Sequence, residues 1–394
     1  MKPLEGVKVL SLTHYLQGPS CVQFLADLGA DVVKVERIGG GFERKWSGAR
    51  TYLANRTSVF FLLAGRNQRS IELDFRKESG RAVLWSLIES SDVLVENFRP
   101  GTLGKYGLSF EEVAARNPRM IYCSLSGYGP DGPNSMRPGQ DLLVQSESGM
   151  AWLTGRAQDP PMPVGSAMVD QHAATLGALG ILAALIERGR TGKGMRVDSN
   201  LLSAALDLQI EPFNYYLNGG KLWDRSASGV STRFHQAPYG TFATADGWLT
   251  VSLTDGATLA KAFSDPEFEE LTGDDQFSKR EEINTRVASL LRADDTQTWE
   301  RILKSNGVWC ARVQTYDEVV ADPQLEANGS VIDYVDASAG PVRLLAHPIR
   351  YNKQVPIMER TPPSLGQHTT EVLRELGYDD AAIDTLRQEG VLGS

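Results

Sequence analysis

The sequence has few cysteines and a deficit of positive charge. Its three cysteines, Cys21, Cys123 and Cys310, lie far apart, with no Cys-x-x-Cys spacing and no paired histidine, so neither a disulfide framework nor a zinc site is indicated. Lys and Arg number 40 against 49 Asp and Glu, a formal net charge of −9. This charge disfavours nucleic acid as the partner, because a phosphate backbone requires a positive surface. A local basic site for a small phosphorylated ligand stays compatible with it.

The chain also lacks the apolar segments that target or anchor a protein. Residues 1–7 lead directly into a strand pattern, so no secretory signal peptide is predicted. The longest apolar stretch follows Asp170, is rich in Ala and Gly, and ends at Glu187 and Arg188, which is too short to cross a membrane. We therefore expect a cytoplasmic protein without a membrane partner. The length of 394 residues predicts about two domains.

Short apolar runs alternate with helical patterns through the first half of the chain. Helices are predicted at about 20–28, 79–90 and 109–116, and strands at 7–12, 31–36, 70–74, 93–96 and 120–124. Strands separated by helices of about three turns require right-handed crossovers and a mainly parallel sheet with both faces covered. The prediction is a Rossmann-like, doubly wound α/β domain that binds ligands at the carboxyl ends of its strands.

The pattern changes beyond about residue 225. Residues 239–253 predict a hairpin that turns at Ala245-Asp246-Gly247. Helices are predicted next at about 279–292 and 296–305, then a strand at 329–335 and an amphipathic helix at 368–376. The expected division is 1–200 (large α/β domain, first part), 201–224 (linker), 225–325 (small α+β domain) and 326–394 (return linker and C-terminal part of the large domain).

One acid stands at a change of pattern in the segment Pro161–Arg188. An irregular Pro- and Gly-containing stretch turns there into a run of Ala, Leu, Gly and Ile that predicts a buried helix, and Asp170 lies at the transition. An Asp in this position is most often an N-cap, whose carboxylate accepts hydrogen bonds from first-turn N–H groups. The same donors would keep a reacting carboxylate ionised, so the two roles are compatible.

The expected strand ends lack the Gly-x-Gly-x-x-Gly of a nicotinamide site, since residues 13–20 contain one glycine and a proline, and Gly39-Gly40-Gly41 opens no helix. They carry cations instead. Each alone is most often a solvated surface charge, but several would converge on one crevice and suit a ligand with a diphosphate and a 3′-phosphate. Phe75 and Phe98 are candidates for stacking on an adenine and equally plausible core residues.

A series of segments, spread over almost the whole chain and sparsest between about 220 and 325, matches the order found in a known family. They are Leu16–Ser20, Leu28–Arg37, Arg69–Asp74, Asp92–Gly101, Asn117–Ile121, Ser126–Pro130, Gly180–Leu185, Thr191–Gly194 and Leu365–Thr369. On these segments the chain resembles the class III coenzyme A transferases of the formyl-CoA transferase and CaiB/BaiF type. So many ordered matches are more specific than any single motif.

The resemblance implies a transferase that moves CoA between an acyl-CoA thioester and a free carboxylic acid. CoA would be its carrier substrate, no metal would be needed, and two chains would form an interlocked homodimer. It implies Asp170 as the nucleophile, and Asp141 falls where related enzymes have an acid near the site. The CoA site carries over onto Leu16, Gln17, Arg37, Leu73, Asp74, Phe75, Arg76, Asn97, Phe98, Arg99, Lys105 and Arg137.

The implied chemistry needs only a carboxylate and hydrogen-bond donors. A carboxylate attacks the thioester, which gives a mixed anhydride and frees the CoA thiolate. The thiolate returns to form an aspartyl-CoA thioester, and the acceptor acid completes the exchange through a second anhydride. Backbone N–H groups at a helix start or a glycine loop would stabilise each oxyanion. Because the activated bond is conserved, ATP is not required.

The chain also departs from its relatives. Leu16 stands where formyl-CoA transferase-like members carry a glutamine, and residues 233–240 occupy the region of their glycine-rich loop, so formyl or oxalyl specificity is not implied. In related α-methylacyl-CoA racemases a His precedes the Asp of a Gly-His-Asp segment. Here that segment is Gly139-Gln140-Asp141, and Gln cannot act as a base. Racemase or epimerase activity is the alternative in the same superfamily, and a non-catalytic CoA-binding module is the alternative from another class.

Four further residues carry charge or can titrate near these segments. His172, two residues past Asp170, is more often a packing or hydrogen-bonding residue than a base. Arg225, Arg233 and His235 are candidates to pair the second carboxylate of a dicarboxylic substrate, with exposed charge as the equal alternative.

Overall fold

The computed structural model describes residues 1–222, 224–227 and 232–393. The chain divides into two compact units. Unit 1 comprises Met1–Val144, Ala167–Ala205 and Pro323–Ser394, and unit 2 comprises Gln145–Ser166 and Leu206–Asp322. This division differs from the expected one, because a segment before residue 167 joins the smaller unit.

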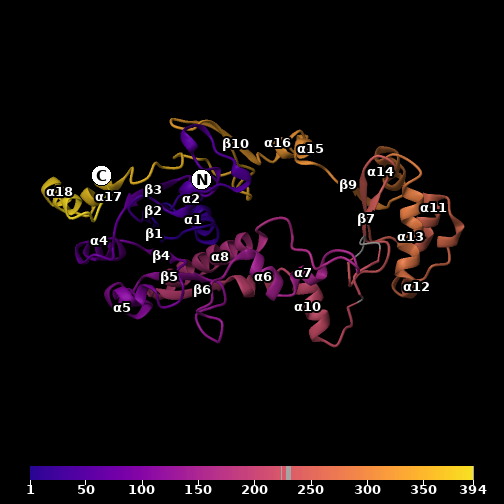
Figure 1. Ribbon diagram of the computed structural model, residues 1–394, viewed down its shortest axis with the longest axis horizontal. Helices are drawn as coiled ribbons and strands as arrows, with labels where there is room; N and C mark the ends of the chain where they lie inside the picture. Colours follow the sequence, from indigo (N-terminus) through magenta and orange to yellow (C-terminus); the bar gives the residue numbers. More distant parts are fainter. Residues whose placement is uncertain (223, 228–231, 394) are drawn as a thin grey trace. The chain divides into compact units, whose positions relative to one another are not determined.

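Unit 1 is built on a six-stranded parallel sheet (Figure 1). The strands are β1 (Lys8–Leu12), β2 (Asp31–Glu36), β3 (Gln68–Glu72), β4 (Val93–Glu96), β5 (Ile121–Ser126) and β6 (Met195–Asn200). Their order is β3-β2-β1-β4-β5-β6, and each neighbouring pair is parallel. The predicted parallel α/β sheet is confirmed. The order reverses between β1 and β4, where a doubly wound sheet opens a crevice for ligands.

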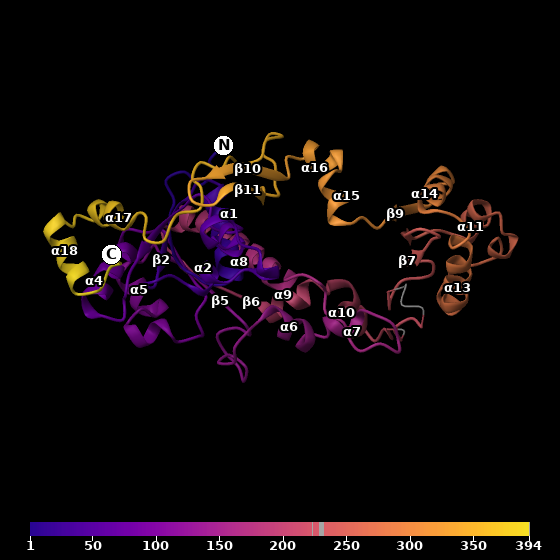
Figure 2. The same ribbon diagram turned by 45° about the horizontal axis from the view of Figure 1, so that its top comes forward.

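Both faces of this sheet are covered. Successive strand residues point to opposite sides of the sheet, so neighbouring residues belong to different cores. Val9 and Val93 belong to a core with α1 (Gln17–Asp27) and α8 (Met168–Thr191). Leu10 and Leu94 belong to the opposite core. The helices of that second core are α4 (Glu78–Glu89), α5 (Phe110–Arg116), α17 (Thr369–Glu375) and α18 (Asp380–Gln388). The C-terminal helices therefore lie beside α4, as both ribbon views show (Figures 1 and 2).

Helix α8 packs through its small residues. A Cβ added at Gly177 would lie 2.8 Å from Leu125 Cδ2 and 3.2 Å from Cys21 Sγ, and one at Gly180 would lie 2.7 Å from Val197 Cγ1. These contacts confirm that the Ala- and Gly-rich run mediates close packing against α1, β5 and β6.

The apolar run predicted a helix buried on all sides, but α8 is exposed on one side. Leu179 and Ile186 are 61% and 71% exposed. The expectation that this segment is too short to span a membrane is also wrong by length and composition alone. One such helix is weak evidence for a membrane span, because a helix that packs in a protein core meets the same criteria. Residues of α8 pack in such a core.

Smaller elements complete unit 1. The hairpin of β10 (Val331–Asp336) and β11 (Gly340–Leu345) packs on α3 (Val59–Leu62). The others are α2 (Phe42–Lys45), the short 3₁₀ turns η1 (Gly48–Arg50), η2 (Ala54–Arg56) and η3 (Leu103–Tyr106), and α16 (Pro323–Ala327). Two helices, α6 (Asp141–Glu147) and α9 (Leu201–Asp207), extend across the boundaries between the units.

Unit 2 centres on an antiparallel sheet in the order β7-β8-β9, with β7 (Gly240–Ala243), β8 (Trp248–Ser252) and β9 (Trp309–Arg312). The predicted hairpin is confirmed, and β9 adds a third strand. Its helices are α7 (Met150–Leu153), α10 (Ile210–Leu217), α11 (Gly256–Phe263), α12 (Gly273–Ser278), α13 (Arg280–Leu291), α14 (Thr296–Ser305) and α15 (Tyr316–Val320), with the turn η4 (Pro266–Phe268). The residues expected as a linker, 201–224, thus contain α9 and α10, which the change of composition concealed.

Candidate active site

The loops that follow β1 and β4 meet where the strand order reverses. Asn97 Oδ1 accepts a hydrogen bond from His14 N at 2.9 Å, and Asn97 Nδ2 donates to His14 O at 2.8 Å. A Cβ added at Gly18 would lie only 3.0 Å from Asn97 Cγ. The predicted CoA residues Leu16 and Gln17 are therefore brought beside Asn97, at the edge where the sheet is expected to bind its ligand.

Gln17 begins helix α1 and is 6% exposed. Among the described residues, its Nε2 has no hydrogen-bond partner. An unsatisfied buried donor costs about 1–3 kcal/mol. This amide can therefore donate to a ligand oxygen without first breaking a bond within the protein.

The segment after β3 contributes one buried and several accessible groups. Leu73 is 1% exposed in the core beside α4, so only its backbone can contact a ligand. Arg76 is exposed and forms a bidentate pair with Asp74, at 2.7 and 2.9 Å. Phe75 and Phe98 are partly buried, with ring centroids 6.5 Å apart. Both side chains pack against this core, which leaves only part of each available to a base.

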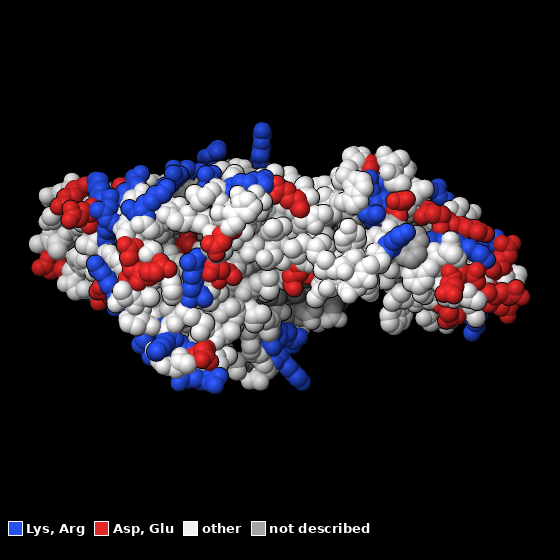
Figure 3. Space-filling model, turned by 90° about the horizontal axis from the view of Figure 1, so that it is seen from below, with Lys and Arg blue, Asp and Glu red and all other residues white. Residues whose placement is uncertain are grey.

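The other predicted cations are exposed. Arg37 follows β2, where its Nε donates to Gly40 O at 2.7 Å. Arg99 and Lys105 follow β4, and the Arg137 guanidinium lies 5.2 Å from the Tyr128 ring. Figure 3 shows Lys and Arg side chains on one face in several separate groups, with acidic groups between them. Exposed cations of this kind suit the phosphates of a ligand at the protein surface.

The two predicted catalytic acids are brought together at the start of α8. Asp170 is the third residue of that helix, and its N-cap residue is Ala167. The backbone N–H of Asp170 donates to Asp141 Oδ2 at 2.9 Å. The expected N-cap role of Asp170 is therefore wrong, because Asp141, which begins α6 and is 7% exposed, takes up a free N–H of this helix.

Two glycines help to place Asp141. A Cβ added at Gly139 would lie 2.4 Å from Gly127 Cα, and one at Gly127 would lie 2.6 Å from Gly139 Cα. Any side chain at either position would separate the two backbones. This close approach holds the start of α6 against the loop that follows β5.

The ionisation of Asp170 differs from what its sequence position suggested. Burial, and second the charge of Asp141, raise the pKa of Asp170 from 3.8 to about 7. No hydrogen bond to its carboxylate comes from the described residues, so none of them offsets the loss of water. A strongly perturbed acid marks a functional site more often than a structural one, and a poorly solvated carboxylate is a stronger nucleophile.

A second buried acid, which the sequence did not reveal as a site residue, lies at the carboxyl end of β4, where the strand order reverses. Glu96 ends β4, is 5% exposed, and is flanked by Leu12 of β1 and Ser124 of β5. It accepts hydrogen bonds from Ser124 Oγ at 2.5 Å and from Phe98 N at 2.8 Å. Burial raises its pKa to about 7. The signal in the sequence was a carboxylate that directly ends the apolar run Val-Leu-Val.

A family model described as CoA-transferase family III matches residues 4–369. The chain belongs to this family. Human succinyl-CoA:glutarate CoA-transferase is 34% identical over 403 residues, which cover 100% of this chain and 90% of the relative. The succinyl-CoA:mesaconate CoA-transferase of Haloarcula marismortui is 32% identical over 401 residues, 96% of this chain and 98% of the relative.

A solved structure agrees with these relatives. The crystal structure of a CaiB/BaiF family protein from Brucella suis is similar with a TM-score of 0.81 at 31% identity, over 95% of this chain and 99% of that one. This chain is therefore an enzyme that transfers CoA between an acyl-CoA and a carboxylic acid, as the resemblance implied.

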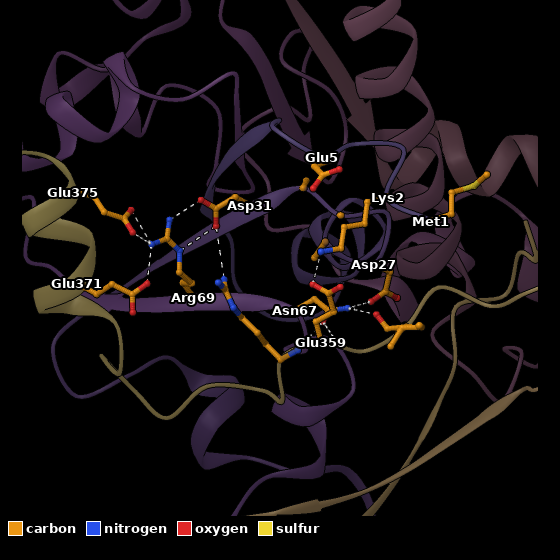
Figure 4. A pocket seen from close by; sticks show the side chains of 15 residues that line it. Met1, Lys2, Glu5, Asp27, Asp31, Asn67, Arg69, Glu359, Glu371 and Glu375 are labelled. Atoms are coloured by element: carbon orange, nitrogen blue, oxygen red, sulfur yellow. Dashed lines mark hydrogen bonds and ion pairs between the residues drawn. The ribbon is translucent and has the colours of Figure 1, made fainter.

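The transferase also has a cavity of about 320 Å³ at the opposite edge of the sheet, where β2 and β3 begin (Figure 4). The Arg69 guanidinium lies within it and pairs with Asp31, Glu371 and Glu375 at 2.6 to 3.1 Å. These pairs attach α17 to the sheet. The ion pairs that line this cavity thus have a structural role. The cavity lies at the amino ends of the strands, away from the carboxyl ends where CoA is expected.

The predicted carboxylate-binding residues of the transferase lie in unit 2. Arg225 donates to three backbone carbonyls of residues 154–160 at 2.8 to 3.2 Å. Arg233 is buried beside Trp152, 5.9 Å from its ring, and this burial lowers the pKa of its guanidinium. His235 is half-buried, and burial lowers its pKa too. The alternative that the two arginines are exposed charges is therefore wrong. His172 lies in the first turns of α8 and is half-buried.

Among the described residues, no group of three or more His, Cys, Asp or Glu side chains could hold a metal ion.

Proposed function

We propose that this transferase moves CoA between dicarboxylic acids, with Asp170 as the covalent carrier. The observation that carries the proposal is the half-buried Asp170 carboxyl at the start of α8, where the backbone N–H of Asp170 donates to Asp141 Oδ2 at 2.9 Å and where partial burial and the charge of Asp141 raise the pKa of Asp170 to about 7. The relatives described above are named for succinyl-CoA with glutarate or mesaconate. Succinate, the acid of succinyl-CoA, is a C4 diacid, and glutarate and mesaconate are C5 diacids. These relatives support this substrate class over monocarboxylic acids.

The reaction proceeds through four exchanges at carbonyl carbons. Ionised Asp170 attacks the thioester carbonyl, the C–S bond breaks, and CoA leaves as the thiolate from a mixed anhydride. The thiolate attacks the aspartyl carbonyl and releases the donor acid as its carboxylate. The acceptor carboxylate then attacks the aspartyl-CoA thioester and expels the thiolate again. Attack of the thiolate on the acceptor carbonyl gives the new acyl-CoA and restores Asp170, with no net proton.

Each tetrahedral intermediate needs a donor aimed at its oxygen. The N–H of Asp170 cannot serve, because Asp141 already accepts it. Gln17 Nε2 is buried and unpartnered among the described residues, which supports it as such a donor. Asp141 acts as an accessory acid that fixes the backbone of the nucleophile.

CoA is proposed to lie across the carboxyl ends of β1 and β4. The pair of His14 with Asn97 supports this position, because it joins the loops that carry Leu16, Gln17 and Phe98. The exposed cations Arg37, Arg76, Arg99, Lys105 and Arg137 are proposed to bind its phosphates. The backbone of residues 73–76 completes the site.

The proposed state of the enzyme is a cytoplasmic, interlocked homodimer. Large apolar side chains exposed on α8, Leu179 and Ile186, support a partner surface in unit 1. The residues Ile210, Tyr216 and Leu217 of α10 are exposed to more than 60% as well. Free cysteines support a reducing compartment.

Trapping of the intermediate tests this function. The enzyme is incubated with succinyl-CoA and then with hydroxylamine, and the modified residue is mapped by mass spectrometry. We expect a hydroxamate at Asp170, no adduct in Asp170→Asn, and an unchanged adduct in Glu187→Gln at the exposed end of the same helix. Full transfer by Asp170→Asn would refute the mechanism. Solvent deuterium at the acyl α-carbon without an acceptor acid would indicate a racemase instead.

A further inference from the structure

Glu96 occupies an unusual place for a carboxyl group. It ends a central strand at the point where the strand order reverses, directly before the loop 97–102 that carries proposed CoA contacts. One carboxyl oxygen accepts the N–H of Phe98, and the other accepts the hydroxyl of Ser124. Glu96 is only 5% exposed, so its contact with the N–H of Phe98 holds the start of this loop from within the protein.

The charges around Glu96 do not neutralise it. Arg196 of β6 lowers its pKa, but the Arg196 guanidinium is paired with Asp198 at 2.9 Å, and Asp198 raises the pKa of Glu96 again. Tyr122 of β5 is neutral, because burial and Glu96 raise its pKa. The neighbouring strand β1 contributes Leu12. Two dipolar donors therefore stand against burial, and burial prevails.

CoA is a polyanion with a diphosphate and a 3′-phosphate. Its binding beside a buried carboxyl group favours the neutral form of that group, since like charges repel more strongly where water is excluded. We propose that Glu96 is a positioning residue of the CoA site, which takes up a proton as CoA binds. The inference rests on the proposed position of CoA across β1 and β4.

The geometry allows the loop to stay in place when the proton arrives. A neutral Glu96 keeps one carbonyl oxygen to accept the N–H of Phe98, and its new O–H donates to Ser124 Oγ. Both contacts persist in either state, and only the charge changes. By linkage, CoA affinity falls as pH rises. If CoA binding raises the pKa of Glu96 by about one unit, the affinity falls by about tenfold between about pH 6 and about pH 9.

Calorimetry measures this proton directly. CoA is titrated into the full-length protein in phosphate and in Tris, whose ionisation enthalpies differ, at about pH 7.5. Asp170→Asn serves as the background, because Asp170 titrates in the same range. We expect uptake of roughly half a proton that is lost in Asp170→Asn/Glu96→Gln. The titration of the 3′-phosphate is common to both variants and cancels in the difference.

Equal uptake in the two variants would overturn the inference. Absence of CoA binding by folded Asp170→Asn would instead refute the proposed CoA site. If Glu96→Gln fails to fold, Ser124→Ala in the same background decides. That change removes a donor to the ionised form, so maximal uptake should move to higher pH. A merely structural Glu96 would leave the pH of maximal uptake in place.

Discussion

The substitution Asp141→Asn should extend the activity of the transferase to lower pH. Asp170 must be ionised to attack, and its pKa of about 7 leaves roughly one-tenth of it active at about pH 6. Removing the negative charge of Asp141 lowers that pKa. Asn Oδ1 can still accept the N–H of Asp170, which is 2.9 Å from Asp141 Oδ2, so the start of α8 should keep its geometry.

The structure bounds the size of the effect. Burial is the larger cause of the rise from 3.8 to about 7, so Asp141 accounts for less than half of it. The acid limb should therefore move down by at most about one and a half pH units. A displacement of about one unit would raise kcat/KM at about pH 6 roughly fivefold and leave the plateau above about pH 8 unchanged.

The assay is the pH dependence of kcat/KM with succinyl-CoA and glutarate. Asp379→Asn is the matched control, because Asp379 also accepts a helix N–H, from Ala382 at 2.8 Å, at the start of α18. It should leave the acid limb in place. A wild-type limb below about pH 5, or one that Asp141→Asn does not move, would refute this account of the nucleophile.

Three further outcomes follow from the same structure. The raised pKa of Asp170 means that the folded state loses stability as pH rises from about 4 to about 7. Asp170→Asn should therefore raise the free energy of unfolding above about pH 7, by at most about 4 kcal/mol, and leave it unchanged below about pH 4. Melting temperatures measured at both pH values check this, and an equal gain at both would contradict it. Asn97→Ala removes both hydrogen bonds between the β1 and β4 loops and should raise KM for acyl-CoA about tenfold with a smaller change in kcat; steady-state kinetics that show only a fall in kcat would be the contrary result. Gly139→Ala should destabilise the fold by about 2 kcal/mol or more and lower kcat, because its Cβ meets Gly127 at 2.4 Å, whereas Gly189→Ala, with open space around it, should do neither in denaturation and rate assays.

The parallel sheet was predictable because its inner strands are continuous apolar runs. β6 was not, since Met-Arg-Val-Asp-Ser-Asn is an edge strand with alternating, half-buried positions and no such run. Helices α9 and α10 were hidden for a related reason. Much of the apolar surface of α10 is exposed in one chain, so its pattern does not mark an inner face.

The identity of the candidate nucleophile was predictable, but its state was not. Resemblance identified Asp170, and the change of pattern located the helix that begins there. Its pKa depends on burial and on Asp141, which lies 29 residues earlier and approaches only through folding. Glu96 escaped notice because the side chain of a strand-end acid is usually solvated, and only the neighbouring strands bury it.

The last two helices have a consequence for the synthesis of the protein. One core of the parallel sheet contains Val372, Leu373, Ile383 and Leu386 alongside residues of β1, β2 and β4. Asp74 N also donates to the carbonyl oxygen of Val391 at 2.8 Å. A nascent chain therefore leaves the part of this sheet face that α17 and α18 cover exposed until residues 369–391 have emerged from the ribosome. Termination before residue 369, which removes both helices, should yield a chain that chaperones retain and proteases remove.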